Sequence, residues 1–287
     1  MRQLLILSGK GGTGKTTIAA AFIKIAEAKA YADCDVDAPN LHLARPQASP
    51  GRRTDFYGMD KAVIDPECCS GCGICYEHCR FGAIREEDDG YMVEPYACEG
   101  CGVCEVLCPT GAATLRPAIA GELRLYKNGT VFSTAKLHMG SGNSGKLVTS
   151  VKSQLREEAP DTALAIIDGS PGIGCPVIAS LSGVDMVLIV AEPSLSGISD
   201  MERIIKTPQT FNLKIGVCIN KFDTNLKASQ RIETICKERN LSFVGKIPFD
   251  SAAIKANNQG LSIVDIECPA SEAVTKVFLE TLKILLN

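Results

Sequence analysis

The sequence predicts an α/β protein in which a doubly wound, mostly parallel sheet carries a small inserted α+β domain. An apolar run at the start of the chain leads into a glycine-rich loop, a helix and a second short apolar run. The same alternation of strands and helices returns in the second half of the chain, and a cysteine-rich repeat interrupts it. This β–loop–α–β order is typical of a parallel sheet with helices on both faces.

The first half of the chain contains the start of that sheet. Residues 2–7 form an apolar run expected to be a buried strand, and residues 15–28, rich in Ala, Ile and Lys, are expected to be a helix. Residues 30–32 are expected to form a short strand that ends at Asp33. Residues 46–60 are polar and contain Gly and Pro, so we expect an irregular linker there.

The second half restores the alternation. Strands are expected at 121–126 and 130–137 around a turn at 127–129, followed by a helix over 145–158 and a strand over 163–167 that ends at Asp168. Later strands are expected at 184–190, 214–219 and 244–247, and an amphipathic helix at 270–286. The predicted core domain is therefore 1–60 and 118–287, and the predicted insert is 61–117.

Composition excludes several classes of function. The 287 residues are 45% hydrophobic and 22% charged, as in an ordinary globular protein. The net charge of −3, the absence of Trp and the 5% of aromatic residues argue against a nucleic-acid surface. No apolar run reaches the roughly 18 residues of a membrane helix. The first apolar stretch ends at the glycine loop and is too short for a secretion signal, so a cytoplasmic location is expected.

The glycine loop has the form of a phosphate-binding loop. Residues 9–16 fit G-x4-G-K-[ST] between a predicted strand and a predicted helix, which is the context this motif requires. Lys15 is expected to supply charge to the terminal phosphates and Thr16 a hydroxyl to Mg²⁺. The nucleotide phosphates are expected against Gly11, Gly12, Thr13, Gly14, Lys15, Thr16 and Thr17. A second match, at 140–146, precedes Leu147 instead of a hydroxyl residue and is interpreted as a loop before a helix.

An extra lysine, Lys10, lies just inside this loop. With it the chain resembles the deviant phosphate-loop ATPases of the MinD superfamily, which include MinD, ParA, Mrp-type cluster carriers and the nitrogenase iron protein. The resemblance implies an ATPase that uses ATP and Mg²⁺. It also implies a dimer, either a homodimer or a heterodimer with a related ATPase, in which Lys10 reaches the partner's nucleotide.

Two further segments carry the same resemblance. Residues 33–41 resemble the switch I segment, which implies that Asp35 orients the attacking water and that Asp33 lies beside the metal and the phosphate loop. Residues 166–172 resemble the Walker B strand and switch II, which places Asp168 near Mg²⁺.

The segment that begins at Asn220 spells N-K-x-D, a motif that reads guanine in GTPases. In MinD-like proteins an Asn at this point contacts adenine, and the segment around Pro248 resembles the end of the MinD-like domain. We therefore expect ATP, with GTP as the alternative.

The insert contains eight of the 14 cysteines, in two C-x2-C-x2-C-x3-C runs. Equivalent positions lie 29 residues apart, and glycines coincide as well as cysteines. The runs resemble those of bacterial two-cluster ferredoxins, which implies two [4Fe–4S] clusters. Zinc is the alternative, but the tandem spacing and Pro109 after the second run favour iron–sulfur clusters.

In such ferredoxins the fourth cysteine of each run binds the other cluster. The implied ligands of one cluster are Cys69, Cys72, Cys75 and Cys108, and those of the other are Cys79, Cys98, Cys101 and Cys104. Arg80 stands where proline is usual, and its charge is expected to raise the potential of the nearby cluster. Cys175, after switch II, is either a buried structural thiol or a ligand of a bridging metal group.

The combined motifs predict an ATP-hydrolysing iron–sulfur protein in which nucleotide-driven dimer switching controls electron transfer to a redox partner. The alternative is an ATP-dependent protein that assembles or carries a metallocluster for another protein. Positioning on a membrane fits poorly, because the chain stops at Asn287, at the end of the last predicted helix, and no membrane anchor is expected.

Overall fold

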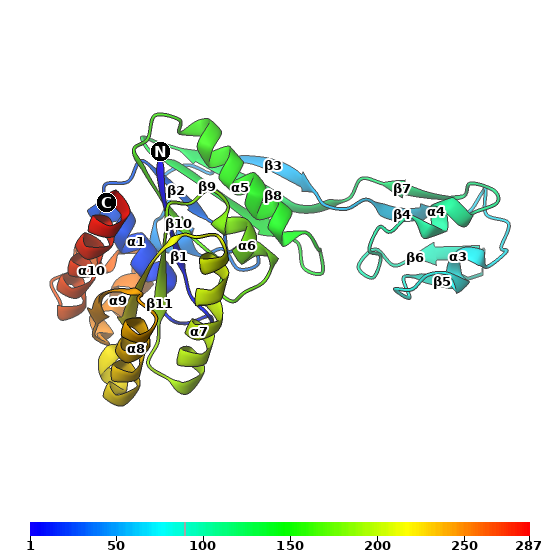
Figure 1. Ribbon diagram of the computed structural model, residues 1–287. Coiled ribbons are helices and arrows are strands. Elements are labelled where there is room, and N and C mark those ends of the chain that lie inside the picture. Colours follow the sequence, from blue (N-terminus) through cyan, green and yellow to red (C-terminus); the bar gives the residue numbers. More distant parts are fainter. Residues whose placement is uncertain (89) are drawn as a thin grey trace. The chain divides into compact units, whose positions relative to one another are not determined.

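The computed structural model describes residues 1–88 and 90–287 and divides the chain into two compact units (Figure 1). The core unit comprises residues 1–53, 123–136 and 145–287, and the cysteine unit comprises residues 54–122 and 137–144. The expected insert, 61–117, lies within the cysteine unit, which also takes in residues on either side of it.

Among the described residues, a nine-stranded sheet has the order β13-β12-β11-β1-β10-β2-β9-β8-β3. The neighbours from β13 to β9 pair in parallel, which confirms the α/β class and the mostly parallel sheet. The strands are β1 (Arg2–Leu7), β2 (Ala30–Asp33), β3 (Arg52–Tyr57), β8 (Ile119–Lys127), β9 (Val131–Leu137), β10 (Leu164–Asp168), β11 (Met186–Ala191), β12 (Lys214–Asn220) and β13 (Ser242–Ile247).

Helices cover both faces of this sheet, with α1 and α10 on one side and α5, α6 and α7 on the other (Figure 1). The helices are α1 (Lys15–Ile25), α2 (Leu41–Ala44), α5 (Ser144–Glu158), α6 (Cys175–Leu181), α7 (Leu195–Thr210), α8 (Leu226–Glu238), α9 (Ser251–Asn258) and α10 (Pro269–Leu286), with 3₁₀ turns at Phe222–Thr224 and Ile263–Asp265. None of the described helices is both long enough and apolar enough to cross a bilayer.

The central strand β1 is apolar at consecutive positions because both of its faces are buried. Leu4 and Ile6 belong to the core cluster that contains α1 and α10, where the rings of Phe22 and Phe278 meet edge to face at 5.0 Å. Leu5, whose side chain points to the opposite face, is also fully buried. This rigid strand ends directly at the phosphate loop, and the loop therefore starts from a fixed position.

The expectation of an irregular linker over 46–60 is wrong for β3. Residues Arg52–Tyr57 form the edge strand next to β8. Only Phe56 of this strand is buried, so no hydrophobic alternation reveals it in the sequence. Since β3 and β8 are neighbours, the chain leaves the core unit and returns to it at adjacent positions.

The cysteine unit contains two antiparallel strand pairs and two short helices. β4 (Lys61–Ile64) pairs with β7 (Ala113–Arg116), and β5 (Ile84–Glu87) pairs with β6 (Gly90–Val93). The helices α3 (Ile74–Glu77) and α4 (Val103–Leu107) each begin after a left-handed glycine at equivalent positions of the repeat, Gly73 and Gly102. Both halves of the repeat thus fold alike.

Candidate functional site

The phosphate loop joins the buried end of β1 to the start of α1. Gly12 and Gly14 have φ angles of 78° and 89°, a left-handed conformation that favours glycine. Gly14 is the N-cap of α1, and no side chain accepts a hydrogen bond from the first amides of the helix. Those amides and the positive end of the helix dipole are therefore available to an anion.

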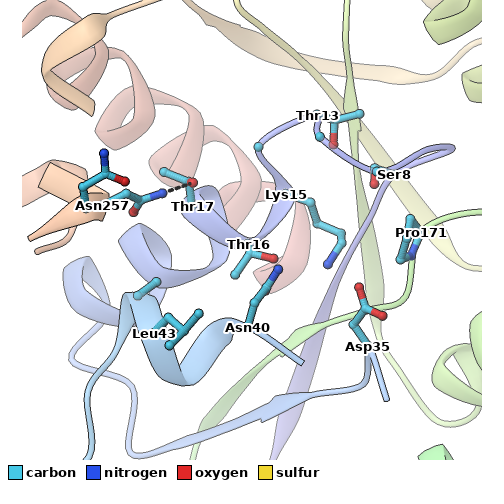
Figure 2. Close-up of a pocket in the computed structure, with 15 residues that line it drawn as sticks. Ser8, Thr13, Lys15, Thr16, Thr17, Asp35, Asn40, Leu43, Pro171 and Asn257 are labelled. Atoms are coloured by element: carbon cyan, nitrogen blue, oxygen red, sulfur yellow. Dashed lines mark hydrogen bonds between the residues drawn. The ribbon is translucent and has the colours of Figure 1, made fainter. Parts of the chain in front are cut away.

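A cavity of about 420 Å³ lies in front of this loop (Figure 2). Lys15 and Asp35 both point into it, and Asn257 donates to the hydroxyl of Thr17 at 2.9 Å at its far side. The lining residues are Ser8, Gly11, Gly12, Thr13, Gly14, Lys15, Thr16, Thr17, Asp35, Asn40, Leu43, Ala44, Pro171, Asn257 and Asn258. The whole predicted phosphate-binding run from Gly11 to Thr17 thus lies on one surface.

Asp168 links two polar side chains of the loop, Lys15 and Thr16. Its carboxylate accepts from Lys15 Nζ at 2.5 Å and from Thr16 Oγ1 at 2.7 Å. Burial alone would lower the pKa of Lys15, but the charge of Asp168 and its hydrogen bond raise that pKa above its ordinary value. In this state Lys15 is a buried cation held by a carboxylate, poised beside the site where phosphates would compete for it.

Asp33 lies behind the cavity wall. Its carboxylate accepts hydrogen bonds from the backbone amides of Asp35, Asn40 and Leu41, at 2.9–3.0 Å. Burial and the charge of Asp168 raise the pKa of Asp33 to about 7. Asp33 therefore holds the segment 35–41 in shape, while Asp35 presents its carboxylate to the cavity.

Burial is also the largest cause that raises the pKa of Asp35 above its ordinary value, and the charge of Asp168 adds to it. Lys15 acts in the opposite direction. A carboxylate with a raised pKa next to a phosphate site is suited to orient and polarise a water molecule.

A second cavity, of about 250 Å³, adjoins the first and is mainly apolar. Gly12, Gly14, Thr17 and Asn257 line both cavities. The remaining lining residues are Ile18, Asn220, Lys221, Ile247, Pro248, Phe249, Asp250, Ala253, Ile254, Ile263, Ala270 and Val274. Its apolar walls and the side-chain amides of Asn220 and Asn257 make it suitable for a flat heterocyclic base.

The N-K-x-D segment supports the phosphate loop from this side. Asn220 donates to Thr13 O at 2.7 Å, and Lys221 Nζ donates to Gly12 O at 3.1 Å. Asp223 is turned to the backbone, where its carboxylate accepts from the Phe249 amide at 2.7 Å instead of lining the base cavity.

Lys10 points away from the phosphate cavity. Its ammonium pairs with Glu192 at 2.9 Å and donates to Ser194 and Ser196 at 3.3 and 3.1 Å. Glu192 follows the end of β11, and its other oxygen lies 3.7 Å from Lys221. Sequence reasoning missed Glu192, although an acid at the carboxyl end of a parallel strand next to a ligand crevice is a usable signal.

The cysteine unit brings cysteines of both runs together. Cys79, Cys98, Cys101 and Cys104 line one small cavity, although Cys79 comes from the other run. Backbone amides point at two of these sulfurs, Ala83 N at Cys79 and Ala62 N at Cys98, each at 3.4 Å. These four cysteines are the ones that the sequence implied as ligands of one cluster, and their role as ligands stays a prediction.

Cys75 also has cysteines of both runs near it. Burial raises the pKa of Cys75, and the charges of Cys69 and Cys108 raise it further. Cys69 and Cys108 therefore lie near Cys75. Cys72 is exposed.

The repeat glycines have matching left-handed backbones. The φ angles are 68° and 65° at Gly71 and Gly100, 77° and 78° at Gly73 and Gly102, and 60° and 69° at Gly82 and Gly111. A Cβ at 71, 82 or 111 would meet no atom within 4 Å, so these turns leave open space beside the cysteines.

Throughout 1–88 and 90–287, no three His, Cys, Asp or Glu side chains could share a single metal ion.

The remaining cysteines have different surroundings. Cys34, Cys218 and Cys236 are buried, and burial raises their pKa values to about 12, 12 and 11, so these are inert core thiols. Cys175, for which a buried position was one expectation, is exposed at the first residue of α6.

The loop 140–146 leads into α5, and neither it nor Lys146 lines the two nucleotide cavities.

Comparison with known proteins gives related chains over nearly the whole length. An uncharacterized protein of Methanocaldococcus jannaschii is 30% identical over 285 residues, which cover 96% of this chain and 95% of that protein. An iron-sulfur cluster carrier protein of the same organism is 21% identical over 298 residues, which cover 96% of this chain and 82% of the carrier.

A solved structure shares the fold. The septum site-determining protein MinD of Pyrococcus horikoshii, complexed with Mg-ADP, matches with a TM-score of 0.58 at 15% identity over 97% of this chain and 95% of that one. The family of the CobQ/CobB/MinD/ParA nucleotide binding domain, CbiA, matches residues 4–263. Together with a phosphate loop whose helix amides are open to an anion, this match means that the chain belongs to the CobQ/CobB/MinD/ParA family of nucleotide-binding domains.

Proposed function

We propose that this protein binds and hydrolyses ATP and uses the resulting switch to control electron transfer through two [4Fe–4S] clusters to a redox partner. The observation that carries the proposal is the presence, in one chain, of a phosphate loop facing a cavity and of a cysteine unit in which Cys79 lines a cavity together with Cys98, Cys101 and Cys104 of the other run. A function that couples the nucleotide site to the cysteine unit accounts for the presence of both in one chain.

ATP is favoured over GTP by the base cavity. Guanine recognition by N-K-x-D needs the carboxylate of the motif to face the base, and here Asp223 is engaged by the Phe249 amide. An amide such as Asn220, beside the apolar walls around Pro248, suits adenine. The MinD protein of similar fold was solved with Mg-ADP, which supports an adenine nucleotide here.

The roles of the nucleotide-site residues follow from their contacts. Thr16 and Asp168 would hold Mg²⁺, which supplies charge to the phosphates. Lys15 would exchange Asp168 for the terminal phosphates, and Asp35 would orient the attacking water. Because Gly172, after β10, donates from its amide to Ser8 O at 3.0 Å, the segment after Asp168 is tied to the phosphate loop and would respond to the nucleotide.

The cysteine unit fits the two clusters by its donor set and its backbone. Thiolates are the ligands that iron–sulfur clusters require, and amides directed at Cys79 and Cys98 would stabilise negative charge on the sulfurs. The clusters, when bound, would supply one-electron redox chemistry. The protein's own part is to hold eight thiolates in two crossed sets and to exclude water from the inner ones, Cys98 and Cys104, which are buried.

The experiment is anaerobic purification followed by voltammetry with and without Mg-ATP. We expect a brown protein with about eight iron and eight acid-labile sulfide per chain, the content of two four-iron clusters. We also expect Mg-ATP to change the cluster potentials or the rate of electron transfer, and the Lys15→Ala variant to keep its clusters and lose this response. Colourless protein that cannot be reconstituted, or identical voltammetry in nucleotide-bound dimers, would count against the proposal.

Delivery of a metallocluster to another protein is the second candidate. It is supported by the 21% identity to an iron-sulfur cluster carrier protein over most of both chains. A carrier should lose iron and sulfide to an apo-acceptor protein in a nucleotide-dependent way. An electron-transfer protein should keep its metal through many redox cycles.

A further inference from the structure

A third cavity of the core unit, of about 450 Å³, lies on the other side of the segment 35–42 from the phosphate site. Residues 37–40 and His42 form one wall of this cavity. The β8 residues Arg124 and Tyr126 and the β9 residues Thr134 and Lys136 form the other wall. Its volume falls in the range of pockets that bind small molecules.

Cationic side chains outnumber carboxylates among the residues that line this cavity. Arg124 and Lys136 contribute two cations, against one carboxylate from Asp37. Burial lowers the pKa of His42, and the charges of Arg124 and Lys136 lower it further, which shows that both cations act on the same space. A guanidinium and an ammonium that converge on one cavity are suited to carboxylate or phosphate groups.

Thr134 gives an independent indication that a ligand belongs there. Its side chain is 4% exposed and borders the cavity, yet within the described part of the chain its Oγ1 has no hydrogen-bond partner. The adjacent buried Ser133, in contrast, donates to Val151 O at 2.9 Å. Buried hydroxyls without a partner are uncommon, so an oxygen of a bound molecule would complete this one.

The wall of this cavity is also part of the nucleotide site. Asn40 borders both cavities, while Asp35 borders the phosphate side and Asp37 the other side. The carboxylate of Asp33 accepts from the amides of Asp35, Asn40 and Leu41, which ties the two ends of the segment 35–41 together. A ligand that draws Asp37–Asn40 toward the strands would therefore displace Asp35.

We propose that this cavity is an effector site for a small multivalent anion, a molecule bearing carboxylate or phosphate groups, whose binding changes nucleotide turnover through the segment 35–41. The inference that the anion binds depends only on the residues of this cavity. The inference that it changes turnover also depends on the proposed function, ATP hydrolysis. By linkage, the anion must bind with different affinity to the ADP and ATP states if it changes their balance.

The test uses the whole protein saturated with Mg-ADP, so that the phosphate loop is occupied and cannot take the probe. Citrate and inorganic phosphate are titrated separately by calorimetry at constant free Mg²⁺, in wild type and in Arg124→Gln, Thr134→Val and the control Lys29→Gln. Lys29 is an exposed lysine that does not line the cavity. The probe that binds with the higher affinity identifies whether the site prefers carboxylates or phosphates.

We expect one anion per chain with unchanged affinity in Lys29→Gln and at least about tenfold weaker binding in Arg124→Gln, as for loss of a charge-assisted hydrogen bond. Thr134→Val should weaken binding about fivefold and leave the stability of the anion-free protein unchanged or higher, because the hydroxyl has no partner there to lose. Absence of binding by both anions, or equal binding in all variants, would overturn the site. A destabilised Thr134→Val protein would show that the hydroxyl is already engaged and would overturn it too.

Turnover is then measured with the stronger anion. A change in ATPase rate that disappears in Arg124→Gln is the expected result. If the anion binds and the protein hydrolyses ATP at the same rate with and without it, the regulatory part is wrong. If the protein binds the anion and hydrolyses no ATP at all, the proposed function is what has failed.

Discussion

Lys15 and Asp168 form a buried ion pair at the phosphate loop. Both side chains are almost inaccessible, 6% and 0% exposed, and their charged atoms lie 2.5 Å apart. Burying one such charge without the other is costly, so each keeps the other in place until phosphates and Mg²⁺ arrive. The same carboxylate holds Thr16, and a single aspartate thus keeps the two phosphate-loop ligands oriented before nucleotide binds.

Replacement of Lys15 and of Asp35 should separate binding from turnover. Lys15→Ala should abolish ATP binding, because the ammonium supplies charge to the phosphates. Asp35→Ala should keep ATP affinity within a few fold of wild type and reduce the hydrolysis rate by about 10²-fold or more, the usual contribution of a general base or water-orienting group. Equilibrium binding of a fluorescent ATP analogue and phosphate release measure the two effects.

The exposed Asp161, outside both nucleotide cavities, provides the control, and Asp161→Asn should behave as wild type. Normal hydrolysis by Asp35→Ala would mean that the segment 33–41 has another role.

Arg80 follows Cys79 and provides a prediction for the clusters. Its side chain is exposed, so its charge acts on the neighbouring cluster through solvent and contributes at most about 1 kcal/mol. Arg80→Ala should lower the potential of the cluster held by the Cys79 set by less than about 45 mV, since 59 mV for one electron corresponds to about 1.4 kcal/mol. The potential of the cluster held by the Cys69 set is the internal control. Equal shifts of both potentials, or no shift, would contradict the assignment.

Residue types and spacing indicated the phosphate loop and the eight cysteines, because both depend on local chemistry. The role of Asp33 did not follow from its motif, since its carboxylate holds backbone amides of residues 35–41 instead of facing the cavity. Glu192 was not predicted either. Its partner Lys10 is 182 residues away in sequence, and only the parallel arrangement of β1 and β11 brings them together.

At the scale of secondary-structure elements, α5 and α6 are joined by a buried lysine. Lys152 of α5 donates to the carbonyl oxygens of Ser180 and Ser182, at 2.5 and 2.6 Å, at the end of α6. Those carbonyls have no partner within α6, and a cation there also opposes the negative end of the helix dipole. Burial nevertheless lowers the pKa of Lys152 to about 8.

This pKa gives a prediction of stability against pH. In the unfolded chain Lys152 titrates near its ordinary pKa of 10.5, so between about pH 8 and 10.5 the unfolded state binds more protons than the folded one. The free energy of unfolding of wild type, relative to Lys152→Met, should therefore rise with pH across this window, by up to about 3 kcal/mol. Below pH 8 the difference should be constant.

Urea unfolding at several pH values, followed by circular dichroism under anaerobic conditions, measures this difference. The comparison with Lys152→Met removes the contribution of Cys218, whose thiol both proteins share and on whose pKa Lys152 does not act. A difference that falls as pH rises would mean that Lys152 is stabilised as a cation in the folded protein.

The elements also show what a sequence can reveal. Helix α5 and the strands β1, β10 and β12 were predicted within about two residues because long apolar or amphipathic runs mark them. β3 was missed because it is polar and gains its regular structure from hydrogen bonding to β8. The start of α1 was predicted, but its end came three residues early at Ile25, where Glu27 adopts a left-handed φ of 47°.

At the scale of the whole chain, the core unit tolerates a large insert because the two strands at which the insert begins and ends, β3 and β8, are neighbours in the sheet. β3 leads out and β8 leads back side by side, so the sheet is not interrupted by the intervening residues. An insert of this kind costs little in loop closure and leaves the phosphate loop of β1 and α1 intact. The combination of a nucleotide switch with a thiol-rich unit therefore requires no change in the core of either.

Lys10 is held within its own chain in this structure, which gives a prediction for the proposed dimer. Its ammonium pairs with Glu192, and the two side chains are 30% and 25% exposed, so the pair contributes at most about 1 kcal/mol. To reach a partner's nucleotide Lys10 must leave Glu192. Two substitutions should consequently act in opposite directions on ATP-dependent dimerisation.

Lys10→Ala should abolish the dimer that forms with ATP, since the lysine supplies the charge that crosses to the partner's phosphates. Glu192→Gln should release Lys10 and favour the dimer by about fivefold per protomer, the equivalent of that 1 kcal/mol. Sedimentation velocity of the Asp35→Ala background with saturating Mg-ATP, in which hydrolysis is slow, measures both. Weaker dimerisation of Glu192→Gln would show that Glu192 itself belongs to the interface, and unchanged dimerisation of Lys10→Ala would show that the lysine does not cross it.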